Sequence, residues 1–160
     1  MILAAGLGTR LRPLTYHLPK PLFPVLNIPS VKRILYELKA AGFKRVVINA
    51  CHLANLLIDS ISRWNLDQEI TLVKEPFLLG TGGALKNALP CFKDGPVLLI
   101  NSDVVTDIDL KAVFEAHCRR HPIATMVLHD RPLFNSIKFI SHERCNLFPG
   151  PYGIGKDIYQ

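Results

Sequence analysis

Residues 1–25, MILAAGLGTRLRPLTYHLPKPLFPV, join a short apolar run to a basic loop that contains two closely spaced glycines. The run Met1–Ala5 predicts a buried strand, and Gly6 and Gly8 follow it at once. In open α/β sheets ligands bind beyond the carboxyl ends of the strands. We therefore expect an α/β domain whose first strand leads directly into a binding loop.

The rest of the chain alternates between predicted strands and predicted helices. The strand candidates are short apolar or β-branched runs, at 1–5, 45–49, 69–74, 96–101 and 124–129. Helices are expected between them, at 30–41, 54–63, 83–89 and 110–120. Gly42 is a stop signal for the first helix, and Asp109 is a candidate N-cap for the last. Strands that are apolar on both faces and alternate with helices predict a doubly wound, Rossmann-like domain of three layers around a mostly parallel central sheet.

Length and composition indicate one soluble globular domain covering residues 1–160. About half of the residues are hydrophobic and a fifth are charged, which is typical of a chain that buries a sizeable core. The longest apolar runs are too short to cross a bilayer, and no secretory signal pattern opens the sequence. A cytoplasmic location is the expectation.

Cysteine spacing and charge exclude several other classes of protein. The four cysteines (Cys51, Cys91, Cys118 and Cys145) form no Cys-x-x-Cys pair and no cluster with histidines, so the sequence supports neither a zinc site nor a disulfide framework. The net charge is +6, and five basic residues precede Glu37, the first acidic residue. This concentration favours a small polyanion as ligand over a nucleic acid, for which no recognition motif is present.

The first loop has the chemistry of a phosphate-binding segment. Gly6 and Gly8 allow close approach of the backbone and present N–H groups, while Arg10 and Arg12 add bidentate donors. The loop lacks the Gly-Lys-Ser/Thr end of a Walker A motif, and it lacks the third glycine of a dinucleotide fingerprint. Taken alone, a glycine-rich turn is weak evidence, and a plain strand-to-loop turn is the favoured interpretation.

Three further residues follow predicted strands or stand in stiff segments. Lys20 lies between two prolines, which restrict the backbone that carries its ammonium group. Glu75 opens KEPFLLGTGGALKNAL, in which a glycine-rich turn begins a helix. Asp103 follows a buried strand and is a candidate ligand for a hard cation such as Mg²⁺. Lys20 has a bland alternative as a solvated lysine and Glu75 as a surface glutamate, whereas helix capping is the alternative for the nearby Asp107 and Asp109.

Four segments occur together in the order of a known family. The segments LAAGLGTRLRPLT, PKPL, EPFLLGTGGAL and NSDV resemble the signature of the sugar-1-phosphate nucleotidyltransferases. The resemblance spans Leu3 to about Val105 and continues more weakly to about Ile140. It implies transfer of a nucleoside monophosphate from a nucleoside triphosphate to a sugar 1-phosphate, which forms a nucleotide sugar and releases pyrophosphate with the help of Mg²⁺.

The resemblance also implies roles for individual residues. Arg10 and Lys20 are the expected catalytic residues and Asp103 is the expected Mg²⁺ ligand. The nucleotide would be contacted by Leu3, Ala5, Gly6, Gly8, Thr9, Arg10, Glu75, Gly80 and Thr81. Because a carboxylate can accept both the N1–H and the N2–H₂ of guanine, Glu75 mildly favours GTP. Uridylyltransferases that act on N-acetylmuramate 1-phosphate remain an alternative to the mannose-1-phosphate guanylyltransferases.

The chain is expected to be truncated relative to this family, with a core at 1–140 and a divergent tail at 141–160. The tail loses the strand and helix alternation and matches no motif expected for the sugar site. A nucleotide-binding fragment or regulatory subunit without catalysis therefore stays open as a further alternative. An uncovered sheet edge or apolar face would favour a homo-oligomer.

Overall fold

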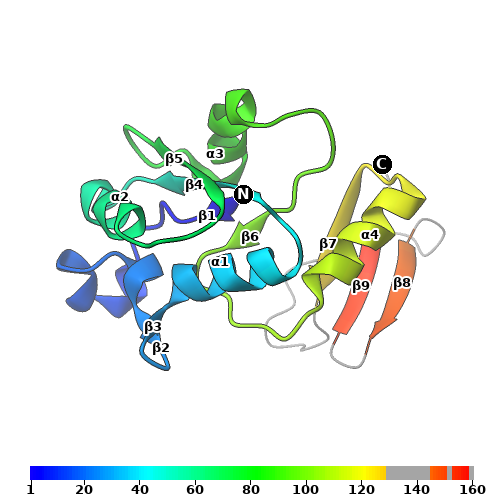
Figure 1. Ribbon diagram of the computed structural model, residues 1–160, viewed down its shortest axis with the longest axis horizontal. Coiled ribbons are helices and arrows are strands. Elements are labelled where there is room, and N and C mark those ends of the chain that lie inside the picture. Colours follow the sequence, from blue (N-terminus) through cyan, green and yellow to red (C-terminus); the bar gives the residue numbers. More distant parts are fainter. Residues whose placement is uncertain (129–144, 151–152, 159–160) are drawn as a thin grey trace. The chain divides into compact units, whose positions relative to one another are not determined.

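The computed structural model describes residues 1–128, 145–150 and 153–158. The chain forms two compact units, Met1–Thr106 and Asp107–Gln160 (Figure 1). The single domain expected over residues 1–160 stays a prediction. No helix in the described ranges combines the length and the apolar character needed to span a bilayer.

A parallel sheet of four strands is the centre of the first unit. The strands are β1 (Ile2–Leu3), β4 (Arg45–Ala50), β5 (Glu69–Lys74) and β6 (Ile100–Asn101). Their order is β5-β4-β1-β6, and Ile2 lies opposite both Ile48 and Ile100. Because β1 is central and the chain builds outward on both sides of it, the predicted doubly wound arrangement is confirmed.

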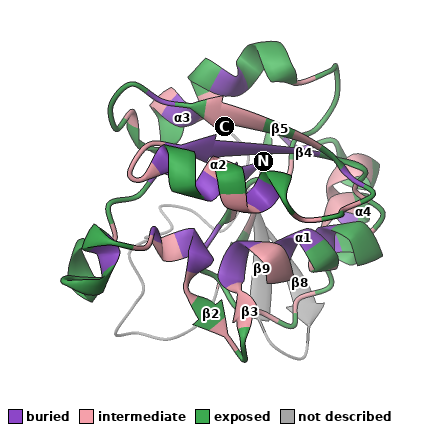
Figure 2. Cartoon of the chain, turned by 60° about the vertical axis from the view of Figure 1, so that its left-hand side comes forward, coloured by how far each residue is buried: buried purple, intermediate pink, exposed green. Residues whose placement is uncertain are grey.

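Three helices belong to this unit: α1 (Ser30–Ala40), α2 (Ala54–Ser62) and α3 (Gly80–Ala88). Figures 1 and 2 both show α3 on one side of the sheet and α1 on the other. Helix α3 packs Ala84 and Ala88 against Met1 and Val47. Strand β4 is buried from Val46 to Ala50, as Figure 2 shows, because helices cover both of its faces.

Short elements connect the strands of the first unit. Strands β2 (Pro24–Val25) and β3 (Ile28–Pro29) form a hairpin whose two turn residues, Leu26 and Asn27, have positive φ. Four 3₁₀ helices complete the unit, namely η1 (Thr9–Leu11), η2 (Leu14–Tyr16), η3 (Lys20–Leu22) and η4 (Leu89–Cys91).

Some element bounds differ from the sequence prediction for identifiable reasons. The first strand ends at Leu3 because the Ala4 N–H donates to the side chain of Asn49 (2.8 Å) and leaves the ladder. The predicted strand 96–101 is regular only at Ile100–Asn101. Helix α3 begins at Gly80 instead of residue 83, and so includes Gly80 and Gly82 although glycine has a low helix propensity.

The second unit contains α4 (Leu110–Arg120) and three strands. The strands are β7 (Ala124–Leu128), β8 (Cys145–Gly150) and β9 (Gly153–Ile158), which form an antiparallel sheet in the order β7-β9-β8. Asp109 caps α4 as predicted, because its carboxylate accepts the Ala112 N–H (3.0 Å).

One expectation for this region is wrong, and the expected divergent tail stays a prediction. The predicted strand 124–129 pairs antiparallel with β9 and does not join the parallel sheet; its last residue, His129, lies outside the described residues. The expected tail 141–160 contains two strands, although 141–144, 151–152 and 159–160 lie outside the described residues.

Candidate functional site

A pocket of about 390 Å³ opens at the carboxyl ends of the parallel strands in the first unit. Segments that follow β1, β5 and β6 contribute to its walls, together with Asn49 near the end of β4. It is lined by every residue that the sequence predicts for the site, namely Leu3, Ala5, Gly6, Gly8, Thr9, Arg10, Lys20, Glu75, Gly80, Thr81 and Asp103. Residues up to 100 positions apart are thus brought together by the parallel topology, as expected for an open α/β sheet.

The pocket also contains residues that the sequence prediction missed. They are Ala4, Leu11, Pro21, Asn49, Leu78, Asn101 and Ser102. Six of them are within two positions of a predicted site residue in the chain. Asn49 is the exception, and its signal was a polar side chain near the end of the otherwise apolar strand RVVINA.

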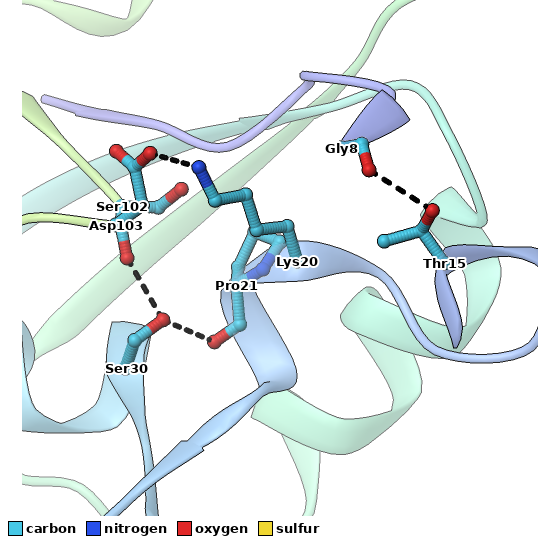
Figure 3. Close-up of polar contacts among 7 residues, drawn as sticks. All are labelled: Gly8, Thr15, Lys20, Pro21, Ser30, Ser102 and Asp103. Atoms are coloured by element: carbon cyan, nitrogen blue, oxygen red, sulfur yellow. Dashed lines mark hydrogen bonds and ion pairs between the residues drawn. The ribbon is translucent and has the colours of Figure 1, made fainter. Parts of the chain in front are cut away.

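Lys20 and Asp103 form an ion pair across the pocket (Figure 3). The lysine comes from the first turn of η3, and the aspartate follows β6. Both side chains are about one-third exposed. The two groups that the sequence assigned to phosphate and to a cation are therefore in direct contact, and each remains open to the pocket.

Gly8 occupies a position that other residues would fit poorly. Its φ is 61°, and a Cβ placed there would lie 2.7 Å from Cγ2 of Thr15. Thr15 is buried and donates its hydroxyl to the Gly8 carbonyl (3.1 Å, Figure 3). His52 contacts the Thr15 carbonyl through Nε2 (2.6 Å), so the loop is anchored to the segment after β4. These contacts fix the curvature of the basic loop at Gly8.

The two arginines of the first loop have different surroundings. Arg10 is exposed and lines the pocket from η1. The Arg12 guanidinium instead lies 5.4 Å from the ring centre of Tyr16, in a cation–π contact. The geometry therefore makes Arg10 the arginine of this loop that faces a ligand in the pocket.

Glu75 is a buried carboxylate with fixed partners. Only 3% of Glu75 and 2% of Asn49 are exposed. The Asn49 amide donates to Glu75 Oε1 (2.8 Å), and its oxygen accepts the Ala4 N–H. The Leu79 N–H lies 3.4 Å from Glu75 Oε2, so the carboxylate also contacts the start of α3. A carboxylate has about four acceptor positions, and these contacts leave acceptor capacity on the pocket side.

Helix α3 points its N-terminal turn into the pocket through Gly80 and Thr81. The first N–H groups of a helix have no partner within the helix, and the helix dipole makes this end partly positive. Together with Arg10 and Lys20, this end of the pocket favours anionic ligands.

Asp103 has the chemistry of a magnesium ligand. Mg²⁺ is commonly held by one or two carboxylates together with phosphate oxygens of the substrate. The Asp103 carboxylate lines the same pocket as Gly8, Arg10 and Lys20. A single carboxylate in a pocket that favours anions fits a cation that also binds phosphate oxygens of a ligand. In the described part of the chain no group of three or more His, Cys, Asp or Glu side chains could hold a metal ion.

The family model described as Nucleotidyl transferase matches residues 1–133. The chain belongs to this family. Its match to N-acetylmuramate alpha-1-phosphate uridylyltransferase of Neisseria meningitidis serogroup B is 42% identical over 117 residues, which cover 72% of this chain and 51% of that protein. Its match to the mannose-1-phosphate guanyltransferase of Yarrowia lipolytica is 37% identical over 131 residues, covering 79% of this chain and 36% of that protein.

A solved structure has a similar fold. The crystal structure of HddC from Yersinia pseudotuberculosis complexed with GMP-PN gives a TM-score of 0.73 at 28% identity, covering 98% of this chain and 71% of that one. The chain thus spans about half the length of the uridylyltransferase and about a third of the guanyltransferase. The family is shared by enzymes that use different bases, which leaves the base to be argued from the pocket.

Proposed function

We propose that this chain forms the nucleotide site of an enzyme that transfers a nucleoside monophosphate from a nucleoside triphosphate to a sugar 1-phosphate. The observation that carries the proposal is that the Gly8 loop, Arg10, Lys20 and Asp103 all line one pocket. A loop that offers N–H groups, two cations and one carboxylate suits a triphosphate bound together with Mg²⁺. The family membership supports the same reaction class.

The proposed reaction brings together two anions, the sugar phosphate and the nucleoside triphosphate, which repel each other. A sugar phosphate oxygen forms a bond to the α-phosphorus, and the bond from that phosphorus to the bridging oxygen of pyrophosphate breaks. Arg10 and Lys20 would neutralise charge on the reacting phosphates, and the Gly8 loop would orient them. Asp103 would hold Mg²⁺, which supplies further charge neutralisation on the phosphate oxygens.

Glu75 supports GTP as the preferred nucleotide. Its carboxylate is held by Asn49 and lines the pocket as an acceptor. Guanine presents two adjacent donors that a carboxylate accepts together, whereas uracil presents one N–H between two carbonyl oxygens. UTP is the second candidate, because the 42% identical relative is a uridylyltransferase.

Calorimetric titration with GTP, UTP, dTTP, ATP and CTP in the presence of Mg²⁺ tests the nucleotide assignment. Tightest binding of GTP is expected, and tightest binding of UTP would select the second candidate. Pyrophosphate release with a panel of sugar 1-phosphates then tests the reaction. Binding without release would instead identify a non-catalytic nucleotide-binding fragment or regulatory subunit.

Arg10→Ala tests the catalytic role of the first loop. We expect a loss of pyrophosphate release of about 100- to 1,000-fold, the range observed when one donor to a developing anion is removed. Arg12→Ala is the matched control, because Arg12 is the other arginine of the same loop and its guanidinium contacts Tyr16. Equal losses in the two variants would contradict the assignment to Arg10. A cytoplasmic location and a homo-oligomer stay predictions.

A further inference from the structure

Ser30 is a buried residue that does not line the pocket. It begins α1 and is 6% exposed. Serine is a common N-cap, yet the cap position here is Pro29, and no side chain caps this helix. The Ser30 hydroxyl is therefore free for contacts outside its own helix.

The polar atoms of Ser30 join two segments that are distant in the sequence. Its Oγ lies 3.0 Å from the Pro21 carbonyl oxygen and 2.9 Å from the Ser102 carbonyl oxygen (Figure 3). Its backbone N–H donates to the Phe23 carbonyl (2.9 Å). A hydroxyl has one proton, so the two carbonyls share it. Both contacts are buried, which makes the loss of this donor costly.

The same two segments carry the ion pair of the pocket. Lys20 precedes Pro21, and Asp103 follows Ser102. Figure 3 shows the Lys20–Asp103 pair on one side of these segments and Ser30 on the other. The Ser102 N–H also donates to the Leu3 carbonyl (3.0 Å), which ties the second segment to the central strand.

We propose that Ser30 is a positioning residue that holds Lys20 and Asp103 opposite each other across the pocket. Without the hydroxyl, the Pro21 and Ser102 carbonyls lose their shared donor inside the protein. The two carbonyls can then regain hydrogen bonds only if they separate and admit water. The segments that carry Lys20 and Asp103 would move with them. The placement of these groups matters for turnover on the basis of the function proposed above, in which both act on phosphates.

The first test does not depend on catalysis. The Lys20 ammonium signal in ¹⁵N-lysine NMR, assigned with Lys20→Arg, is expected in the wild-type protein because Asp103 holds the group. Ser30→Ala should lose this signal, and Ser30→Thr, which keeps the hydroxyl, should retain it. Ser62→Ala is the matched control, since the exposed Ser62 hydroxyl also donates to a backbone carbonyl (Ile58, 2.9 Å). Absence of the signal from the wild type, or its survival in Ser30→Ala, would overturn the proposal.

The second test is the kcat and KM of pyrophosphate release. Ser30→Ala should lower kcat by about 10- to 100-fold with a smaller change in the KM for the nucleotide, because small displacements of positioned groups act mainly on the transition state. Ser30→Thr should restore kcat, and Ser62→Ala should match the wild type. Circular dichroism confirms that each variant is folded.

The two tests separate this inference from the proposed function. One outcome is that the wild-type protein shows the Lys20 signal but no turnover, and that only the Ser30→Ala variant loses the signal. This outcome would contradict the proposed reaction and support the role of Ser30. Turnover with unchanged kcat in a folded Ser30→Ala variant would overturn the role of Ser30 and leave the reaction standing.

Discussion

Gly8 and Glu75 are both held by side chains that stand several residues or more away in the sequence. Thr15 closes on Gly8, and Asn49 binds Glu75. Loop residues that bind phosphates must present N–H groups in one arrangement before the ligand arrives, because ordering them on binding would cost affinity. The contacts from Thr15 and Asn49 supply this order in the first loop and at Glu75.

Gly8→Ala should destabilise the protein by about 1–3 kcal/mol, since a Cβ at positive φ is strained and would contact Thr15 Cγ2 at 2.7 Å. Gly6→Ala is the matched control. A Cβ at Gly6 meets nothing within 4 Å, and its φ is not in the left-handed range. Urea unfolding measures both free energies, and a Gly8→Ala variant as stable as Gly6→Ala would show that the loop can relax freely.

Asn49→Asp should make stability depend on pH. The variant places a second carboxylate against Glu75 at two buried positions, and two like charges in contact repel. Protonation of one carboxylate relieves the repulsion, so the stability deficit relative to the wild type should shrink as the pH falls from about 8 to about 5. Asn49→Ala is the control without added charge. Unfolding midpoints across this pH range measure the difference, and a deficit that is constant with pH would contradict the repulsion.

At the scale of elements, strand ends and one helix start build the pocket. The parallel ladder aligns the ends of β1 and β6, so the Gly8 loop and Asp103 lie at one edge of the sheet. Helix α3 adds its N-terminal turn, which begins at Gly80 with a φ of 68°. The left-handed backbone conformation of Gly80 thus occurs at the point where the first turn of α3 lines the pocket.

Gly80→Ala should therefore cost about 1–3 kcal/mol of stability, because an alanine is strained at positive φ even though the space around it is open. Gly82→Ala in the same helix provides the opposite control. Gly82 is exposed, its Cβ would meet nothing within 4 Å, and its φ is ordinary, so alanine should stabilise the protein by about 1 kcal/mol. Thermal unfolding compares the two, and a shift of the same sign in both would contradict the role given to the Gly80 conformation.

Element type was predictable where the chain repeats an apolar period. Helix α4 has the predicted bounds of 110–120, and α1 ends one residue before the predicted position. The 3₁₀ turns were not predicted, because three residues carry too little periodicity to be recognised. The antiparallel pairing of β7 with β9 was missed, since a strand pattern does not identify the partner of the strand.

The pocket-lining residues were predictable where a loop carries its chemistry in consecutive positions. The glycines, Arg10 and Lys20 stand together in the first loop, and parallel topology places Asp103 beside them. Asn49 and Ser30 were missed because their partners are distant: Ala4 is 45 residues from Asn49, and Ser102 is 72 residues from Ser30. No local pattern shows that a hydroxyl or an amide will be buried against such a segment.

At the scale of the whole chain, every residue that lines the pocket belongs to the first unit, Met1–Thr106. This unit also contains the complete parallel sheet with α1, α2 and α3. The proposed nucleotide site and the elements that hold it are therefore encoded by the same continuous segment. The second unit has its own antiparallel sheet and its own helix.

A fragment of residues 1–106 should consequently fold and bind Mg²⁺ with the preferred nucleotide within about tenfold of the affinity of the full chain, a difference of about 1.4 kcal/mol. The physical reason is that the fragment retains the whole sheet, its helices and all of the pocket lining. Calorimetric titration of the fragment and of the full chain, each beside its Arg10→Ala variant, measures the difference. A folded fragment with no detectable binding, against a full chain that binds, would show that residues 107–160 contribute directly to the nucleotide site.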